Sequence, residues 1–481
     1  MIGNDSPMFS LEDVLKATAG ILISGKQENA FYGISTDSRL LGKGNLFVAL
    51  KGEKFDGHDF VRTAMKQGAA GVLAHDEVNI NQMMANQNFA VIKVADTLTA
   101  LGDLAQAWRR RFSVPVIGLT GSSGKTTTKE MMAAIISRRK NILKTEGNLN
   151  NLIGLPQTIF RLTREHEVVI LEMGTNTRGE IKRLTQIAAP DIGLITNVGP
   201  AHLAGFGSMD VVRDEKSDLF LNMSLSSTAI INLDDEAITI AAEKWHGRRI
   251  TYSMSPNADV TVKDIERNGV KGVSFNLVVG GSTRKVEMRI AGLHHVHNAM
   301  AAAAVAVGID LKTIVEGLAS FRPFSGRMEI IKLHNGAFLL DDSYNANPAS
   351  VREALMTLKD LKIHRNGYVF LGDMLELGEE AGEMHRKIGM LIATIGVNAL
   401  FLQGDFSEIT AAGAMEGGLS TENIFFLSDK ERGIVYLKEH LKKGDWILVK
   451  GSHGMKMEKI AAQICEDFGA DKINGNNKTI H

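Results

Sequence analysis

The eight residues from Thr120 to Thr127 constrain the fold of this 481-residue chain more than any other stretch. They read Thr-Gly-Ser-Ser-Gly-Lys-Thr-Thr and close an apolar run, 114–120, that has the composition of a buried strand. After them, Met132 and Ile135 recur at helical spacing. Because a strand, a glycine-containing loop and a helix in that order are typical of a parallel sheet, the stretch predicts an α/β fold.

The same loop is suited to holding an anion. Its glycines let successive backbone N–H groups point at one site, and the helix N-terminus adds a partial positive charge. Lys125 would place a full charge on the β- and γ-phosphates of a nucleotide, and Thr126 would offer its hydroxyl to Mg²⁺. The usual spelling has a first glycine where this chain has Leu119, so a chance Gly-Lys-Thr turn is the alternative. The candidate nucleotide-binding residues are Gly121, Ser122, Ser123, Gly124, Lys125, Thr126 and Thr127.

Short apolar runs alternate with helical stretches along the whole chain, and this alternation predicts three α/β units. We expect a small first unit over 1–96, a central parallel-sheet unit over 97–324, and a third unit over 325–481 with a second, smaller doubly wound sheet. The polar residues 474–481 are expected to fray. Helices are predicted over 98–112 and from about residue 298. Strands are predicted at 45–50, 70–74, 90–94, 114–120, 168–172, 192–197, 228–234, 337–341, 367–371, 400–403 and 446–450.

Charge and composition argue against several classes of protein. The 54 basic and 55 acidic side chains nearly cancel, which is unlike a strongly basic nucleic-acid binder. Cys465 is the one cysteine in the sequence, so no disulfide can form within the chain, and this fits a reducing cytosol. The longest apolar block, 299–307, is too short to span a bilayer, and the first residues lack a secretory signal pattern. We therefore expect a cytoplasmic monomer without nucleic-acid or membrane partners.

Three further side chains could serve a phosphate site. Glu172 closes the apolar run 168–172 and is a candidate Mg²⁺ ligand, although an ordinary strand-end acid would look the same. His202 follows the strand predicted at 192–197 and is a candidate metal ligand or phosphate contact, with a structural loop histidine as the alternative. Lys216 lies in the sequence Arg-Asp-Glu-Lys-Ser, which by itself indicates an exposed helix face.

A local histidine cluster raises the question of zinc. His294, His295 and His297 lie close together in the sequence. No cysteine or acid nearby completes a convincing set of zinc ligands, so we do not expect a zinc site there.

Several stretches occur in a distinctive order. The phosphate loop is followed by Thr-Glu-Gly-Asn-Leu-Asn-Asn at 145–151, by Ala201-His202 and by the helix after His294. Together they resemble the Mur ligase family, the ATP-dependent peptide ligases of peptidoglycan precursor synthesis. Two later stretches are Asp-Asp-Ser-Tyr-Asn-Ala-Asn-Pro at 341–348 and Gly-Asp-Met-Leu-Glu-Leu-Gly at 372–378. They look like those of the members that add D-alanyl-D-alanine to UDP-N-acetylmuramoyl-tripeptide.

The resemblance implies a role for each unit. The first would bind the UDP end of UDP-N-acetylmuramoyl-tripeptide, and the second would bind ATP. The third, a Rossmann-like domain, would bring D-alanyl-D-alanine and close over the site. ATP would convert the substrate carboxylate into an acyl phosphate, which the dipeptide amine then attacks. The substrate-binding residues implied by the resemblance are Ser35, Thr36, Asp37, Ser38, Arg39, Asn148, Asn151, Asn345 and Asn347.

The resemblance also implies catalytic and metal-binding roles in the central unit. Lys125 and Thr126 would hold phosphate and a first Mg²⁺, with Glu172 assisting. His202 and Lys216 would serve a second Mg²⁺. In the family a lysine at the position of Lys216 is carbamylated, and a carbamate is an anion that can bind a cation.

Nucleotide contacts are implied from both sides of the site. From the third unit, Arg327 would contact the ATP phosphates as a catalytic residue, and Asp342 would lie near the ribose. The family usually has His-Asn where this chain has His294-His295. Asn298 is therefore the expected adenine contact, because an amide offers a donor and an acceptor together.

Two alternatives remain open at this point. A sibling ligase is one, yet folylpolyglutamate synthases have a phosphate loop much nearer the start, and diaminopimelate-adding enzymes carry an Asp-Asn-Pro-Arg motif that this chain lacks. The other is a P-loop protein that binds nucleotide without ligation, which leaves the stretch 342–348 unexplained. The sequence does not indicate whether the third residue of the tripeptide is lysine or diaminopimelate.

Overall fold

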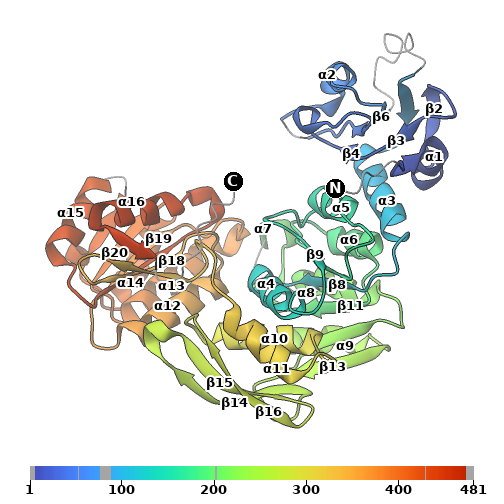
Figure 1. The fold of residues 1–481 in the computed structure, drawn as a ribbon. Helices are drawn as coiled ribbons and strands as arrows, with labels where there is room; N and C mark the ends of the chain where they lie inside the picture. Colours follow the sequence, from blue (N-terminus) through green and yellow to red (C-terminus); the bar gives the residue numbers. More distant parts are fainter. Residues whose placement is uncertain (1–5, 53, 76–87, 201–202, 428–429, 473–481) are drawn as a thin grey trace.

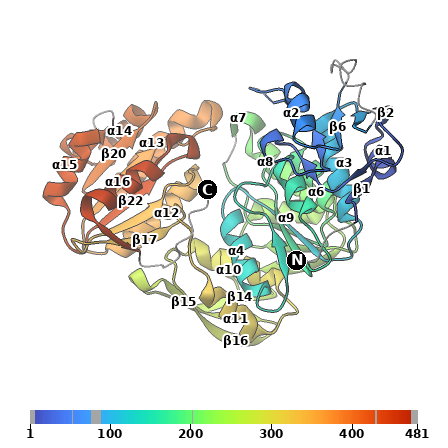
Figure 2. The ribbon, with the colours of Figure 1, turned by 45° about the horizontal axis from the view of Figure 1, so that its top comes forward.

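The computed structural model describes residues 6–52, 54–75, 88–200, 203–427 and 430–472, and it shows three lobes in chain order (Figure 1). The first lobe projects from the central lobe, and the third lobe lies to one side of the central lobe in both orientations (Figure 2). This three-domain α/β architecture confirms the fold class expected from the sequence. The predicted fraying of 474–481 and the candidate His202 lie outside the described residues.

The first lobe is a small α/β unit. Its helices and strands are β1 (Phe9–Ser10), α1 (Leu11–Thr18), β2 (Ile21–Ser24), β3 (Ala30–Phe31), β4 (Ile34–Ser35), β5 (Leu46–Val48), α2 (Val61–Lys66), β6 (Gly71–Ala74) and β7 (Ala90–Lys93). One sheet has the order β2-β7-β6-β5-β4, with β2 antiparallel to β7 and the other pairs parallel, while β1 and β3 form a separate ribbon.

A single helix, α3 (Thr97–Arg109), connects the first lobe to the central lobe. Asp96 caps its N-terminus by accepting a hydrogen bond from the backbone N–H of Thr99 at 2.6 Å. Leu101 and Leu104 are fully buried in the core of the first lobe. The helix also lies against α5 (Gly154–Phe160) of the central lobe, so it belongs to both packing units.

The central lobe contains the largest sheet. Its helices and strands are β8 (Val116–Thr120), α4 (Lys125–Ile136), β9 (Ile142–Lys144), α5, β10 (Val168–Glu172), α6 (Glu180–Ala188), β11 (Ile192–Ile195), α7 (Leu203–Phe206), α8 (Met209–Leu221), β12 (Thr228–Asn232), α9 (Glu236–Glu243), β13 (Arg248–Tyr252), β14 (Val260–Arg267), β15 (Val273–Val279), β16 (Ser282–Met288), α10 (His294–Val305) and α11 (Leu311–Ser320). The strand order is β16-β15-β14-β13-β12-β11-β8-β10-β9.

The register of this sheet determines where the site lies. Strands β9 to β14 are parallel, and β8 lies between β10 and β11. Glu172 pairs with Leu119, and Ile195 pairs with Thr120, so these strands end side by side. Apolar side chains of α4, α10 and α11 cover one face, and those of α5, α6, α8 and α9 cover the other. Helices therefore cover both faces of the sheet, and the carboxyl ends of its strands remain accessible to a ligand, as in other doubly wound sheets.

The third lobe is a second sheet with helices on both faces. Its helices and strands are β17 (Glu329–Leu333), β18 (Phe338–Asp342), α12 (Pro348–Lys362), β19 (Gly367–Gly372), α13 (Ala381–Thr394), β20 (Ala399–Gln403), α14 (Ser407–Glu416), β21 (Ile424–Phe426), α15 (Lys430–His440), β22 (Trp446–Lys450), α16 (Glu458–Phe468) and β23 (Ala470–Lys472). The order is β21-β20-β19-β22-β18-β17-β23, parallel from β21 to β18 and antiparallel at β17 and β23.

The sequence analysis did not predict several strands that are partly exposed. The hairpin strands β14, β15 and β16 extend the central sheet with antiparallel pairs, and β14 and β16 expose many side chains. Half-exposed strands lack the continuous apolar runs that mark buried parallel strands.

The predicted start of α10 near residue 298 was also wrong, because this helix begins at His294. No helix in the described parts of the chain is long and apolar enough to cross a membrane.

Candidate active site

A cavity of about 630 Å³ lies between the central and third lobes. Its walls come from the carboxyl ends of both large sheets, the position at which open α/β sheets bind ligands. Many of the site residues predicted from the sequence line this cavity. They are Ser122, Ser123, Gly124, Lys125, Thr126, Thr127, Asn148, Asn151, Glu172, Asn298, Arg327, Asp342, Asn345 and Asn347. The fold thus brings together side chains from six separate stretches of the sequence.

The phosphate loop turns between β8 and α4 in a conformation that requires glycine. Gly124 has a φ of +74°, and a Cβ at this position would lie 2.6 Å from Oδ1 of Asn298. The Nζ atom of Lys125 donates to the carbonyl oxygen of Gly121 at 2.6 Å, so its ammonium lies over the loop. Burial lowers the pKa of Lys125, and the charge of Glu172 opposes this shift. The loop, the helix N-terminus and one lysine therefore surround the same space, which is the geometry of an anion site.

Thr126 and Glu172 are neighbours, although 46 positions separate them in the chain. The hydroxyl of Thr126 donates to Oε1 of Glu172 at 3.2 Å, and Nδ2 of Asn150 donates to the same oxygen at 3.0 Å. Glu172 is 2% exposed, and its Oε2 atom has no hydrogen-bond partner among the described residues. The two groups nominated as Mg²⁺ ligands thus lie side by side at the phosphate loop.

Lys129 is a buried cation that the sequence analysis did not single out. It lies on α4, and its Nζ atom donates to the carbonyl oxygen of Thr145 at 2.8 Å. The same atom lies 3.4 Å from Oε2 of Glu172. The sequence could have indicated Lys129, because it follows Lys125 by four residues and residues at that spacing share a helix face. Lys129 joins α4 to the start of the stretch 145–151 and offsets the charge of the buried carboxylate.

Lys216 is buried, so the exposed helix face that its local sequence indicated is wrong. It lies on α8 with 2% of its surface exposed, next to Glu215, which is also buried. The carboxylate of Glu215 accepts hydrogen bonds from the backbone N–H groups of Gly179 and Ile181 at the start of α6. This contact holds α8 against the start of α6. Burial and then the charge of Lys125 lower the pKa of Lys216 to about 7.

Arg327 enters the cavity from a tight turn before β17. Its neighbours Gly326 and Met328 both have positive φ, at +74° and +58°. The N–H of Gly326 donates to Oδ2 of Asp341 at 3.1 Å, and the N–H of Met328 donates to Oδ1 of Asp342 at 3.2 Å. The two carboxylates at the end of β18 therefore hold the turn that presents Arg327.

A half-buried histidine, His294, and a buried one, His295, lie at the start of α10. Burial lowers the pKa of His294 to about 4 and holds the pKa of His295 well below its usual range. Nδ1 of His295 lies 3.4 Å from Nδ2 of Asn298, whose Oδ1 accepts from the hydroxyl of Thr128 at 3.3 Å. Nε2 of His295 has no hydrogen-bond partner in the described part of the chain. Neutral imidazole and amide groups that line a cavity can pair with the edge of a base.

A smaller cavity of about 200 Å³ shares part of its wall with the first. It is lined by Ser122, Lys125, the segment Asn345–Asn347, the segment Leu375–Leu377 and the segment Ser452–Gly454. Lys125 and Asn345–Asn347 line both cavities. A molecule bound in the smaller cavity would therefore lie next to the phosphate loop.

The residues nominated for the UDP end lie in the first lobe and line neither of these cavities. They are Ser35, Thr36, Asp37, Ser38 and Arg39. Nη2 of Arg39 lies 2.7 Å from Oδ2 of Asp37, and this contact lowers the pKa of Asp37 to about 2. The hydroxyl of Thr36 accepts a hydrogen bond from Nε2 of Gln157 on α5 at 2.9 Å. The segment therefore lies where the first lobe meets the central lobe.

Sequence models of three domains match most of the chain. The model described as "Mur ligase family, catalytic domain" matches residues 30–109. The "Mur ligase middle domain" matches 119–306, and the "Mur ligase, glutamate ligase domain" matches 326–453.

Relatives of known name are similar over nearly the whole chain. The UDP-N-acetylmuramoyl-tripeptide–D-alanyl-D-alanine ligase of Bacillus subtilis is 34% identical over 460 residues, which cover 95% of this chain and 98% of that protein. The ligase of the same name from Escherichia coli is 36% identical over 443 residues, which cover 90% and 94%.

Solved structures agree in fold. A crystal structure of MurF from Acinetobacter baumannii matches with a TM-score of 0.86 and 31% identity, covering 95% of this chain and 99% of that one. MurF ligase from Thermotoga maritima in complex with ADP matches with a TM-score of 0.80 and 26% identity, covering 91% and 97%.

Proposed function

The chain belongs to the Mur ligase family, and on that premise we propose that it is an ATP-dependent ligase that joins D-alanyl-D-alanine to UDP-N-acetylmuramoyl-tripeptide in peptidoglycan precursor synthesis. One observation carries the proposal. Lys125 of the central lobe and Arg327 of the third lobe line the same cavity. A site that must gather two anions needs cations from more than one direction.

The chemistry explains why those cations matter. A carboxylate is a poor acyl donor because its leaving group would be oxide. Transfer of the γ-phosphoryl group forms a bond between the carboxylate oxygen and phosphorus, breaks the bond to the β-phosphate oxygen and releases ADP. Lys125 and Arg327 offset the charge of the two anions as they approach, and the loop N–H groups hold the phosphates.

The second step forms the amide. The free amine of D-alanyl-D-alanine attacks the carbonyl carbon of the acyl phosphate, phosphate leaves and the nitrogen loses a proton. The smaller cavity suits the dipeptide, because its wall includes Lys125 and is therefore adjacent to the reacting phosphate. Asn345 and Asn347 would bind the dipeptide from the third lobe, and Asn148 and Asn151 would contact the muramoyl peptide from the central lobe.

The residues at the phosphate loop fit a Mg²⁺ ion. Mg²⁺ prefers oxygen ligands and is usually held by one or two protein groups together with substrate phosphates. Thr126 and Glu172 offer a hydroxyl and a carboxylate, and Oε2 of Glu172 is buried without a hydrogen bond. A bound Mg²⁺ would offset charge on the phosphates. No larger set of His, Cys, Asp and Glu ligands occurs within the described ranges, so the phosphates would supply the remaining oxygens.

A second cation would be served by His202 and a carbamylated Lys216. Lys216 is buried near Lys125, and its lowered pKa makes a neutral amine available at neutral pH. A neutral amine and CO₂ give an anionic carbamate, which converts a repelling cation into a ligand.

The domain roles follow from the same proposal. Residues 1–96 would bind the UDP end, with Ser35–Arg39 near the junction with α5. Residues 97–324 would bind ATP, with Asn298 at adenine and Asp342 of the third lobe at the ribose. Residues 325–481 would bind the dipeptide and close over the nucleotide. The cytoplasm is the expected location, since ATP and the UDP-linked precursor are consumed together.

A phosphate-release assay tests the proposed function. Purified protein receives ATP, Mg²⁺ and UDP-muramoyl-tripeptides that end in either lysine or diaminopimelate, with D-alanyl-D-alanine present or omitted. We expect rapid phosphate release and a new amide only when the dipeptide is present, and a preference for one tripeptide. Lys125→Ala should lower the rate by roughly 100-fold or more, because it removes a charge aimed at the transferred phosphoryl group.

The matched control is Lys140→Ala, which removes an exposed lysine paired with Glu167 beyond the end of α4. It should retain the parent rate. Full activity in Lys125→Ala would contradict the phosphate-loop assignment. Nucleotide binding without any amide product would instead favour a P-loop module that does not ligate.

A further inference from the structure

Lys450 is a buried cation at the end of β22, the strand between β18 and β19. Its side chain is 2% exposed, and the residue lines the larger cavity. The register pairs it with Asp342 on one side and with Leu371 on the other. Lys450 therefore lies at the carboxyl edge of the third sheet, in the wall of the larger cavity.

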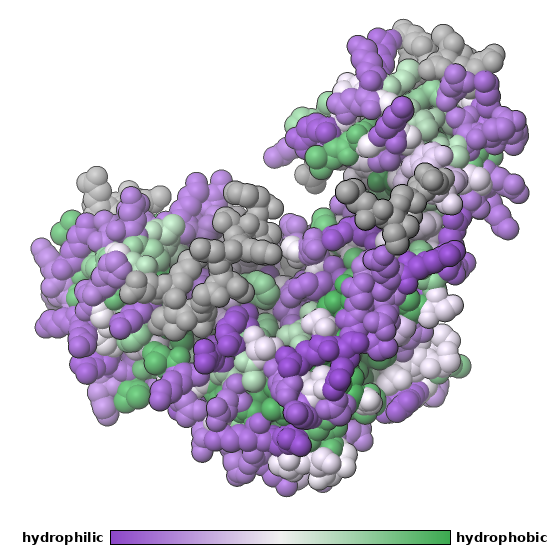
Figure 3. All heavy atoms as spheres, in the orientation of Figure 1, coloured by the Kyte–Doolittle hydropathy of each residue, from purple (hydrophilic) through white to green (hydrophobic). Residues whose placement is uncertain are grey.

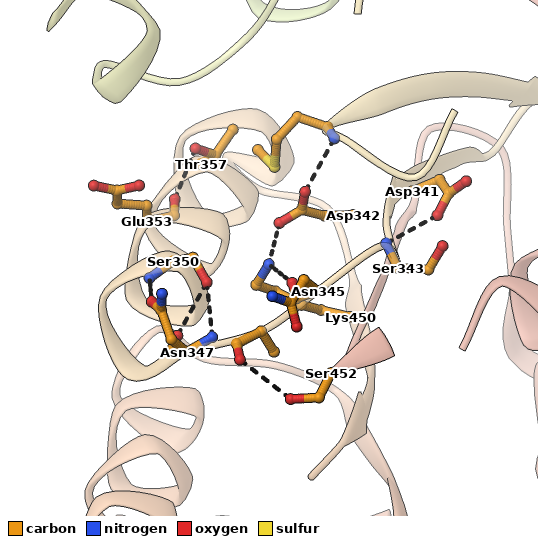
Figure 4. A network of polar contacts seen from close by, with 12 residues as sticks. Asp341, Asp342, Ser343, Asn345, Asn347, Ser350, Glu353, Thr357, Lys450 and Ser452 are labelled. Atoms are coloured by element: carbon orange, nitrogen blue, oxygen red, sulfur yellow. Dashed lines mark hydrogen bonds and ion pairs between the residues drawn. The ribbon is translucent and has the colours of Figure 1, made fainter. Parts of the chain in front are cut away.

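The ammonium of Lys450 makes two contacts with different parts of the site (Figure 4). Its Nζ atom lies 2.5 Å from Oδ2 of Asp342 and donates to the carbonyl oxygen of Asn345 at 2.9 Å. Both contacts are charge-assisted and shielded from water, which makes them stronger than surface hydrogen bonds.

The first contact, with Asp342, connects Lys450 to the turn that presents Arg327. The other oxygen of Asp342, Oδ1, accepts from the backbone N–H of Met328, which follows Arg327 in a turn with positive φ on both sides. By fixing the carboxylate of Asp342, Lys450 fixes one anchor of that turn. The backbone turn that presents Arg327 therefore depends on a lysine at the end of β22.

The second contact leads to the wall shared by the two cavities, Asn345–Asn347. Lys450 holds the backbone of this wall at Asn345, and two residues later the hydroxyl of Ser452 donates to the carbonyl oxygen of Ala346 at 3.2 Å. The same hydroxyl accepts from the N–H of Leu375 at 2.8 Å, in the opposite wall of the smaller cavity. The segment that directly follows β22 thus joins both walls of that cavity through Ser452.

We propose that Lys450 is a positioning residue that sets the geometry of the nucleotide side and the dipeptide side of the site at once, through Asp342 and through Asn345. This inference rests on the proposed function, because it assigns the smaller cavity to the amine substrate. Removing the ammonium should loosen both the Arg327 turn and the Asn345–Asn347 wall. The UDP end of the other substrate, held by the first lobe, should be unaffected.

The test is steady-state kinetics of Lys450→Met, which keeps an unbranched side chain and removes the charge. We expect KM for ATP and KM for D-alanyl-D-alanine to rise about tenfold or more each, as loss of charge-assisted hydrogen bonds implies. KM for UDP-muramoyl-tripeptide should change less than about twofold. The matched control is Lys438→Met, which removes an exposed lysine paired with Asp467 in the same lobe and should leave all three KM values at parent level.

A merely structural role gives a different pattern. A smaller folded fraction lowers kcat and leaves the KM values unchanged, and a general distortion raises all three KM values together. Either pattern would overturn the proposal. If Lys450→Met does not fold, Lys450→Gln replaces it, since glutamine retains a hydrogen-bond donor, and the same split between KM values is expected.

The activity of the parent enzyme distinguishes a failure of this inference from a failure of the proposed function. If the parent forms no amide from D-alanyl-D-alanine and the UDP-linked tripeptide, the proposed function fails and this inference fails with it. If the parent is active and the Lys450 variants show parental KM values, this inference alone fails.

Discussion

At Glu353, burial and neighbouring charges have opposing effects on the pKa of a single side chain of the site. It lies half-buried on α12 and lines the larger cavity. Burial raises its pKa from 4.5 to about 7, the charges of Lys450 and His297 lower it, and the charge of Asp342 raises it. Between these two pKa values the folded state binds a proton that the unfolded state has released. Stability from this group is therefore present at low pH and is lost as pH rises through about 7.

Glu353→Gln should remove this pH dependence, because glutamine does not ionise. We expect the free energy of unfolding of the parent to fall, relative to the variant, by on the order of 1 kcal/mol between about pH 5 and about pH 8. Urea denaturation at a series of pH values measures the difference. The control is Glu408→Gln at an exposed position on α14 of the same lobe. Parallel stability curves for the parent and Glu353→Gln would contradict the prediction.

At the scale of elements, the start of α12 joins local stability to the site. Asn347 caps this helix, accepting from the N–H of Ser350, while the hydroxyl of Ser350 contacts the N–H of Asn347 in return. Pro348 occupies the first helical turn, where its fixed φ suits the helix. The amide Nδ2 of Asn347 also lies 3.4 Å from the carbonyl oxygen of Ser122 in the phosphate loop. One side chain thus caps a helix of the third lobe and touches the central lobe.

Two substitutions separate these functions of Asn347. Asn347→Ala removes the cap and should lower the free energy of unfolding by about 1 kcal/mol. Asn347→Asp keeps an accepting oxygen, so it should retain stability while losing the donor to Ser122. Both should raise KM for D-alanyl-D-alanine in the phosphate-release assay. Equal stability of the two variants in thermal denaturation would count against the capping role.

At the scale of the whole molecule, the site depends on how the lobes meet. The N–H of Ala204 donates to the carbonyl oxygen of Glu376 at 3.0 Å, and Arg267 pairs with Asp360 at 2.9 Å. Both contacts join the central and third lobes. On the face drawn in Figure 3 the molecule is hollowed between the first and third lobes, above the central lobe. On the proposed assignment, a substrate held by its UDP end on the first lobe would extend along this hollow toward the central lobe.

We expect the lobes to close further when the substrates bind, because on the proposed assignment Arg327 of the third lobe contacts phosphates that the central lobe holds. Small-angle scattering should show a smaller radius of gyration with a non-hydrolysable ATP analogue and UDP-muramoyl-tripeptide together than without ligands. Arg327→Ala should reduce this change, since it removes the third lobe's charge on the phosphates. Identical scattering curves with and without ligands would exclude closure.

Local features of the chain could be predicted from the sequence because neighbouring residues suffice to form them. The phosphate loop, its flanking strand and its helix are contiguous, so spacing and glycine placement were enough to nominate Lys125 and Thr126. Glu172 was nominated for a similar reason, because parallel strands that end in polar residues meet at one edge. The three-domain α/β architecture also followed from the alternation of short apolar runs with helical stretches.

The burial of charged side chains was decided by tertiary structure. Lys216 has the local pattern of an exposed helix face, and Lys129 and Lys450 were not nominated from the sequence, yet all three are buried. Desolvating a lysine is unfavourable unless a partner lies close by, and for Lys129 and Lys450 the partners Glu172 and Asp342 come from elsewhere in the chain. Asp342 stands 108 residues before Lys450, and no short window of sequence contains both. Local sequence was enough to predict the buried parallel strands and the polar groups at their ends, whereas the packing of one lobe against another decided which charges meet.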